Sequence, residues 1–152
     1  MTVQILDGKG KLLWERDGDD LDSADLQGVD LSSAELEGAM LSDANLQRAT
    51  LREANLYWAV LFRARLQECD LRKARLCGAD LKGADLRDSD LRGADLGVDN
   101  LGGATQLHGA NLTGAKLDGA SLKGAEYDFL TVFPSNFDPN AHGMKFVGMP
   151  RT

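Results

Sequence analysis

The chain has 152 residues, of which 43% are hydrophobic and 27% charged, and its formal net charge is −7. This composition is too apolar for a disordered chain and too acidic for a protein that binds nucleic acid through a basic surface. No apolar run is long enough for membrane insertion, the first residues lack the pattern of a secretion signal, and two cysteines are too few for a disulfide scaffold. We therefore expect about one domain in the cytoplasm.

The first 18 residues are typical of two short strands joined by a turn. The segment VQILDGKGKLLW has a mostly apolar stretch on each side of Asp7-Gly8, which is a turn signal. We expect residues 1–18 to form an N-terminal β-hairpin cap. The side chains expected to lie over the segment that begins at residue 19 are Val3, Ile5, Leu13 and Trp14.

A five-residue repeat begins there. Leucine occupies every fifth position from Leu21 to Leu101 and resumes at Leu107 after a slip of one residue, while the residue two positions before each leucine is usually alanine. A period of five fits neither an α-helix nor a flat strand. A coil with one corner every five residues keeps all the leucines inward, which predicts a solenoid.

The outward positions indicate how many sides one coil has. Arg52, Arg72 and Arg92 are twenty residues apart, as are Asp70 and Asp90. Four sides of five residues would stack these side chains in neighbouring coils of a parallel β array. The roughly 110 residues of repeat then correspond to about five and a half coils.

Units such as ADLKG, ADLRD and ANLTG resemble the A(D/N)LXX pattern of the pentapeptide-repeat family, over residues 19 to about 129. The resemblance implies a bacterial protein with an all-β fold, a right-handed quadrilateral parallel β-helix. The family has no catalytic motif, so the resemblance implies no catalytic residues in this chain. The best-known members of the family are quinolone-resistance proteins, which bind DNA gyrase by imitating duplex DNA.

One segment at mid-rod carries large apolar groups at outward positions. Leu56, Ala59 and Leu61 belong to the inward ladder, which leaves their neighbours outside. Clustered aromatic side chains beside arginines are the composition of an interface hot spot. Scattered surface apolar residues are the alternative interpretation. The candidate interaction patch comprises Met40, Tyr57, Trp58, Val60, Phe62, Arg63 and Arg65.

Charge is distributed unevenly along the repeat. Acidic residues dominate from Glu15 to Glu37, and basic residues dominate from Arg48 to Arg75. Arg52, Arg72 and Arg92 form a candidate basic face, which would either bind an acidic partner or be neutralised by neighbouring aspartates. A DNA mimic needs continuous negative charge, and a basic waist interrupts it.

The slip between Leu101 and Leu107 inserts one residue into the period, and Asp99 breaks the small-residue rule just before it. We predict a bulged corner within Gly102 to Gln106, with the shaft of the solenoid continuing past it.

The repeat ends in a tail rich in aromatic residues, 130–152, which resembles the C-terminal segments of bacterial and notably cyanobacterial pentapeptide-repeat proteins. Solenoid ends expose unpaired backbone, so the tail is expected to cap the shaft. A dimer interface is the alternative. The side chains expected to close the shaft are Phe129, Phe133, Phe137, Met144 and Phe146.

Reactive side chains are scarce and scattered. His108 is expected to point outward, and neither it nor His142 belongs to a group with metal-ligand spacing. Cys69 occupies a small inward position, whereas Cys77 should point outward, so no disulfide is expected between them. We predict no enzyme activity, no cofactor and no metal.

Two functions remain after these exclusions. The first is a non-catalytic scaffold or interaction protein, whose partner is another protein or a second copy, with no direct nucleic-acid binding. The alternative is a DNA-mimicking protein of the quinolone-resistance type that binds DNA gyrase.

Overall fold

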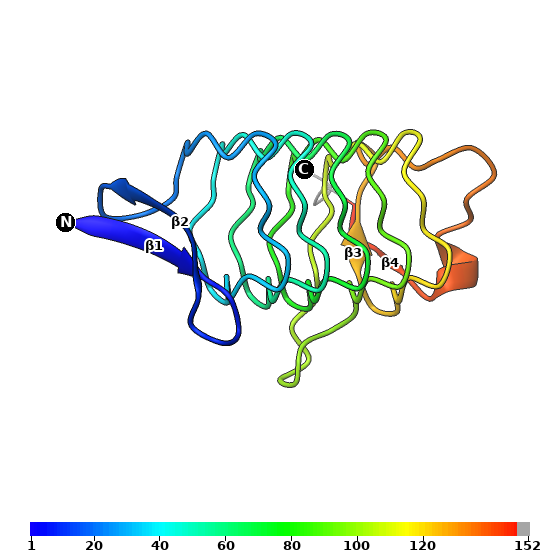
Figure 1. The fold of residues 1–152 in the computed structure, drawn as a ribbon. Helices are drawn as coiled ribbons and strands as arrows, with labels where there is room; N and C mark the ends of the chain where they lie inside the picture. Colours follow the sequence, from blue (N-terminus) through cyan, green and yellow to red (C-terminus); the bar gives the residue numbers. More distant parts are fainter. Residues whose placement is uncertain (149–152) are drawn as a thin grey trace.

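The chain winds into a rod of stacked coils, with a β-hairpin at one end and the C-terminal segment at the other (Figure 1). The structure, a computed structural model, describes residues 1–148. Parallel β-bridges join residues twenty positions apart along the rod, for example Asp25 with Asn45 and Asn45 with Arg65. One coil therefore has four five-residue sides, as the spacing of the outward residues predicted, and the fold is a β-helix solenoid.

The interior of the rod is built from the two repeated positions. Every fifth residue from Leu21 to Leu96 is a leucine that is at most 5% exposed. The small residue two positions earlier is also buried in most sides, as at Ala54 and Ala59. Large and small side chains alternate within each layer, and this alternation fills a narrow shaft without aromatic residues.

The corners of the coil require an unusual backbone conformation. The second residue after each buried ladder leucine except Leu96 has a positive φ, between 55° and 80°. Glycine adopts this conformation without a steric penalty, which explains why so many repeats end in glycine. Trp58 occupies such a corner with φ 58°, where a bulky side chain costs about 1–2 kcal/mol.

The ladder is interrupted by a larger insertion than the sequence predicted. Arg75 pairs with Asp95, twenty residues later, but Asp80 pairs with Gln106, twenty-six residues later. Six residues have therefore been added after Leu96, and they form a loop that projects from the side of the rod (Figure 1).

The predicted one-residue bulge within Gly102 to Gln106 is wrong, and so is the assignment of Leu101 to the inward ladder. Leu101 is 84% exposed at the loop. The error has a simple cause, because six extra residues shift a five-residue period by one. The prediction that the shaft continues past the interruption is confirmed by the buried Leu107 and Leu112.

Thr105 repairs the hydrogen bonding where the loop rejoins the coil. In a regular coil a corner N–H donates to a backbone carbonyl of the next coil, as Trp58 does to Cys77 at 3.1 Å. At Gly78 the insertion displaces that carbonyl, and the N–H donates instead to Oγ1 of Thr105 at 3.1 Å. Thr105 is completely buried, so its hydroxyl satisfies a donor that would otherwise lack a partner.

The N-terminal hairpin pairs β1 (Thr2–Leu6) with β2 (Leu12–Asp17) in antiparallel register. Its side chain Ile5 is 1% exposed and belongs to the core. The hairpin also bonds to the first coil, since the Glu35 N–H donates to the carbonyl of Leu6 at 2.8 Å.

The C-terminal segment contains β3 (Glu126–Tyr127), the short 3-10 helix η1 (Asn140–His142) and β4 (Lys145–Phe146), with β3 and β4 parallel. Among residues 1–148 no helix is long and apolar enough to cross a membrane.

Only part of the tail packs where it was expected. Met144 is buried, and Phe133 and Phe137 are half-buried against the core. The expectation that Phe129 and Phe146 help to close the shaft is wrong, because they are 77% and 46% exposed. The centres of their rings lie 4.8 Å apart in an edge-to-face arrangement.

Candidate interaction surface

The aromatic segment at mid-rod has the inward and outward residues that its sequence predicted. Leu56, Ala59 and Leu61 are completely buried. Trp58 and Phe62 are 38% and 40% exposed. These two large apolar side chains therefore lie on the surface of a rod whose other outward positions are mainly polar.

The remaining residues of the predicted patch lie beside them. Met40 is exposed and forms a parallel bridge with Val60, which places it one coil below, as expected. The guanidinium of Arg63 lies 6.0 Å from the centre of the Phe62 ring. Arg65 is also exposed, on the next side of the coil.

The inserted loop folds back onto the aromatic segment, which the sequence did not predict. The Asn100 N–H donates to the Tyr57 hydroxyl at 2.6 Å, and that hydroxyl lies 3.1 Å from the Asn100 Oδ1. The indole Nε1 of Trp58 donates to Oδ2 of Asp99 at 2.7 Å. Two members of the predicted patch are therefore already engaged within the chain.

Asp99 organises the loop through its other carboxylate oxygen. Oδ1 accepts hydrogen bonds from the N–H groups of Leu101 at 2.8 Å and Gly103 at 2.7 Å. The indole of Trp58 first, and then the backbone N–H of Gly103, hold the pKa of Asp99 below its ordinary value. Ionised Asp99 thus joins the turn of the loop to the side of the rod.

Gly78 provides the space for this contact. A Cβ atom at this position would lie 2.6 Å from Cδ1 of Trp58 and 2.9 Å from Oδ2 of Asp99. The indole of Trp58 can reach the loop only because Gly78, at the same corner of the next coil, has no side chain.

The docked loop changes which residues are available to a partner. Tyr57 is half-buried, while Leu101 and Val98 on the loop are 84% and 46% exposed. We call Trp58, Phe62, Val98 and Leu101 the loop surface. Sequence reasoning missed Leu101 because it coincides with the leucine period. The break at Asp99 was the one signal that marked the loop.

The contact between Asp99 and Trp58 should depend on pH. A carboxylate whose pKa is lower in the folded protein stabilises it above the ordinary aspartate pKa of about 3.9 and loses that effect as pH falls through the lowered value. In a Trp14→Phe variant, we expect the fluorescence of Trp58 to change below about pH 4, in the same range. Adding Asp99→Asn should abolish this transition, and an unchanged transition would show that another group causes it.

The predicted basic face contains two neutralised arginines. Arg72 forms a two-pronged pair with Asp70, at 2.8 and 2.6 Å, and Arg92 forms the same pair with Asp90, at 2.9 and 2.6 Å. Hydrogen bonding from Arg92 lowers the pKa of Asp90 to about 2. This geometry favours the salt-bridged interpretation of the face.

Arg52 differs from the other two arginines because Thr50 occupies the position of the pairing aspartate. Its nearest acidic group is Glu53, at 3.8 Å. Arg52, Arg72 and Arg92 line one shallow depression of about 320 Å³ together with Lys73.

Both cysteines are buried free thiols. Cys69 fills its inward position as predicted, with Sγ 2.7 Å from the Leu46 carbonyl, and burial raises its pKa to about 12. The expectation that Cys77 points out into solvent is wrong, because Cys77 is only 6% exposed. Its Sγ lies near the carbonyl of Asp95 and the backbone of Gly97, where the inserted loop begins, and burial raises its pKa to about 11.

Neither thiol should therefore react readily in the native protein. The thiolate is the reactive form, and both raised pKa values leave it scarce at about pH 8. We expect negligible reaction with Ellman's reagent under native conditions and two reactive thiols per chain in denaturant. Rapid modification of either thiol in the native protein would contradict their burial.

The histidines form no common site. His108 is half-buried rather than freely exposed, with Nε2 3.9 Å from Oε2 of Glu126. His142 stacks on Phe137 at a ring distance of 4.3 Å, in the C-terminal segment. Within the described part of the chain, no three His, Cys, Asp or Glu side chains are grouped to hold a metal ion.

A family model of pentapeptide repeats matches residues 20–57, 59–97 and 105–126, in eight copies. The unmatched residues 98–104 fall within the inserted loop. None of the curated proteins compared with the chain matches it significantly.

Several solved structures are similar. HetL, a pentapeptide repeat protein involved in heterocyst differentiation regulation from the cyanobacterium Nostoc sp. strain PCC 7120, is 31% identical, with a TM-score of 0.60, over 82% of this chain and 71% of HetL. A pentapeptide repeat protein from the Arabidopsis thaliana thylakoid lumen is 26% identical, with a TM-score of 0.51, over 73% of this chain and 66% of that protein.

Proposed function

Because this chain belongs to the pentapeptide-repeat family, we propose that it is a non-catalytic interaction or scaffold protein of the bacterial cytoplasm. Its partner is another protein or a second copy of the chain, and it requires no cofactor and binds no nucleic acid directly. The observation that carries the proposal is the loop surface. Hydrogen bonds to Tyr57 and Trp58 hold the inserted loop against the rod, and the loop presents Leu101 almost fully to solvent.

We also propose the finer architecture of the rod. It is a right-handed quadrilateral β-helix of about five and a half coils over residues 19–129, with residues 1–18 and 130–148 as its caps. Residues 149–152 of the predicted C-terminal cap lie outside the described residues. Burial of Ile5 and Met144 against the two ends of the core supports this division.

The proposed contact site is the predicted patch, extended by the loop. Trp58 and Phe62 supply the aromatic groups that dominate binding energy in many interfaces. Leu101 and Val98 add exposed apolar groups, which are costly to leave in water without a use.

The surface charge favours a scaffold over a DNA mimic. A mimic requires free carboxylates in place of phosphates. Here Asp70, Asp85 and Asp90 are each paired through two hydrogen bonds with an arginine, which removes their negative charge from the surface. HetL is involved in the regulation of heterocyst differentiation, which supports a binding function for the present chain.

The proposed contact site is tested by replacing exposed apolar residues of the loop surface and, as a control, an exposed leucine outside it. We expect Leu101→Ser combined with Phe62→Ser to reduce partner capture, or self-association measured by sedimentation velocity, at least about tenfold. Leu130→Ser is the control, because Leu130 is a 64% exposed leucine that lies near Gly109 and outside the inserted loop. Equal capture and equal mass for both variants would contradict the proposed surface. A gyrase supercoiling assay with a quinolone tests the alternative function separately.

A further inference from the structure

One side of the last coil lacks a neighbouring strand. The C-terminal segment continues three sides of this coil through backbone hydrogen bonds. In these bonds the N–H groups of Leu107, Leu112 and Gly124 donate to the carbonyls of Glu126, Val132 and Gly143, respectively. The fourth side, residues 115–119, has no such continuation within the described chain. Among residues 1–148, no group accepts from the N–H groups of Leu117 and Gly119.

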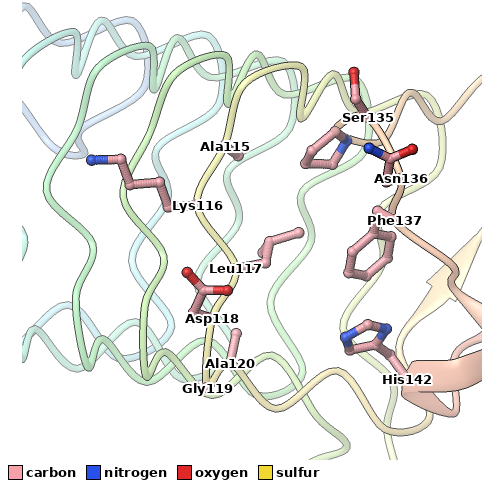
Figure 2. A pocket seen from close by; sticks show the side chains of 11 residues that line it. Ala115, Lys116, Leu117, Asp118, Gly119, Ala120, Ser135, Asn136, Phe137 and His142 are labelled. Atoms are coloured by element: carbon pink, nitrogen blue, oxygen red, sulfur yellow. The ribbon is translucent and has the colours of Figure 1, made fainter.

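The chain bypasses this side and leaves a groove. The segment from Pro134 to His142 stands away from residues 115–119, and the space between them has a volume of about 510 Å³. Figure 2 shows Leu117 and Asp118 on one wall, opposite Phe137 and His142. A volume of this size lies within the usual range of binding pockets, about 300–1,000 Å³.

The groove offers the same hydrogen-bonding groups as the regular ladder. In the preceding coil, Leu91 and Gly93 donate to the carbonyls of Lys116 and Asp118, and Lys116 donates to the carbonyl of Ser89. The corresponding groups one coil later are the N–H of Leu117, the N–H of Gly119 and the carbonyl of Ala115. All three lack partners within the described residues.

We propose that this groove binds an extended peptide of a partner protein by parallel β-strand addition. Three successive peptide residues would complete the ladder. The N–H of the first peptide residue donates to the carbonyl of Ala115, and its carbonyl accepts from the N–H of Leu117. The second residue places an apolar side chain between Leu117 and Phe137. The carbonyl of the third residue accepts from the N–H of Gly119. Main-chain bonds of this kind supply affinity, and the side chains supply selectivity.

The charges of the edge strand define which peptide fits. Lys116 and Asp118 are exposed on the outer face of the strand and form no ion pair within 4.0 Å in the described part of the chain. Residues at equivalent positions of adjacent strands lie side by side, and opposite charges there attract. The preferred core is therefore acidic, apolar, basic, as in Glu-Leu-Lys.

The free protein provides a first check. We expect the amides of Leu117 and Gly119 to exchange with solvent much faster than those of Leu91 and Gly93, which are paired. Equal protection of the Leu117 and Gly119 amides and the Leu91 and Gly93 amides would mean that the edge is already occupied. That result would overturn the proposal.

The binding test uses a labelled peptide with the sequence Ala-Glu-Leu-Lys-Gly and the full chain. We expect saturable binding by fluorescence anisotropy, with protection of the Leu117 and Gly119 amides. Methylating the backbone nitrogen of the peptide's glutamate should weaken binding at least about tenfold, because that nitrogen donates to Ala115. Absence of saturable binding, or equal binding of the methylated peptide, would overturn the proposal.

A charge exchange tests the selectivity without altering the core. Lys116→Glu combined with Asp118→Lys should reverse the preference, so that Ala-Lys-Leu-Glu-Gly binds better than the first peptide. Lys9→Glu with Asp17→Lys, in the hairpin at the far end, is the matched control and should leave the preference unchanged. An unchanged preference in the groove variant would refute the acidic, apolar, basic rule.

Discussion

Replacing Leu71 with alanine is expected to lower the free energy of unfolding by about 2–5 kcal/mol. Leu71 is 1% exposed, between the completely buried Leu51 and Leu91 of the adjacent coils. The shaft is too narrow for neighbouring side chains to fill the void, because each layer is completed by alanine-sized groups. Thermal or chemical denaturation, followed by circular dichroism, measures the loss.

Leu117→Ala is the internal comparison for this prediction. Leu117 belongs to the same leucine ladder, but it is 9% exposed and faces the groove instead of another leucine. Part of its surface is already in contact with water, so the same truncation should cost less. Equal losses would show that position in the stack does not matter, in conflict with nearest-neighbour stabilisation of a solenoid.

Gly78→Ala is expected to release the inserted loop as well as to destabilise the corner. The φ of Gly78 is +72°, where alanine costs about 1–2 kcal/mol. The new Cβ would also meet the indole of Trp58 at 2.6 Å, so the ring must move and its hydrogen bond to Asp99 must break. We expect a change in tryptophan fluorescence and faster amide exchange at Leu101 and Gly103.

Gly38→Ala separates these two effects. Gly38 occupies the equivalent corner with φ +65°, and a Cβ atom added there would have no neighbour within 4 Å. This variant should carry the backbone cost alone and leave the loop in place. If both variants gave the same fluorescence and exchange, the contact between Trp58 and Asp99 would not hold the loop.

Much of the fold was predictable because the interior repeats strictly. A leucine every fifth residue, with a small residue two positions before it, permits few other arrangements than a coil with a corner at each repeat. The spacing of Arg52, Arg72 and Arg92 favoured four sides over three. These predictions depend only on which residues face inward, and local sequence carries that information directly.

The inserted loop shows where sequence periodicity misleads. Six residues shift a period of five by one, so Leu101 matched the ladder although it is exposed. The contact between Trp58 and Asp99 spans 41 residues, and no local pattern relates them. Similarly, Cys77 is buried beside the backbone of Asp95 and Gly97, where the inserted loop begins, and Phe129 and Phe146 contact each other while remaining exposed.

Local sequence was sufficient to predict a solenoid and its inward ladder up to Leu96, and it favoured four sides, because burial repeats with the period of the chain. Which outward residues form surfaces depends on contacts between distant parts of the chain. The loop engages Tyr57 and Trp58 and exposes Leu101, and the C-terminal segment pairs with three sides of the last coil and leaves residues 115–119 open. These features arise where the repeat is interrupted or ends, and there the path of the chain is set by long-range packing and hydrogen bonding.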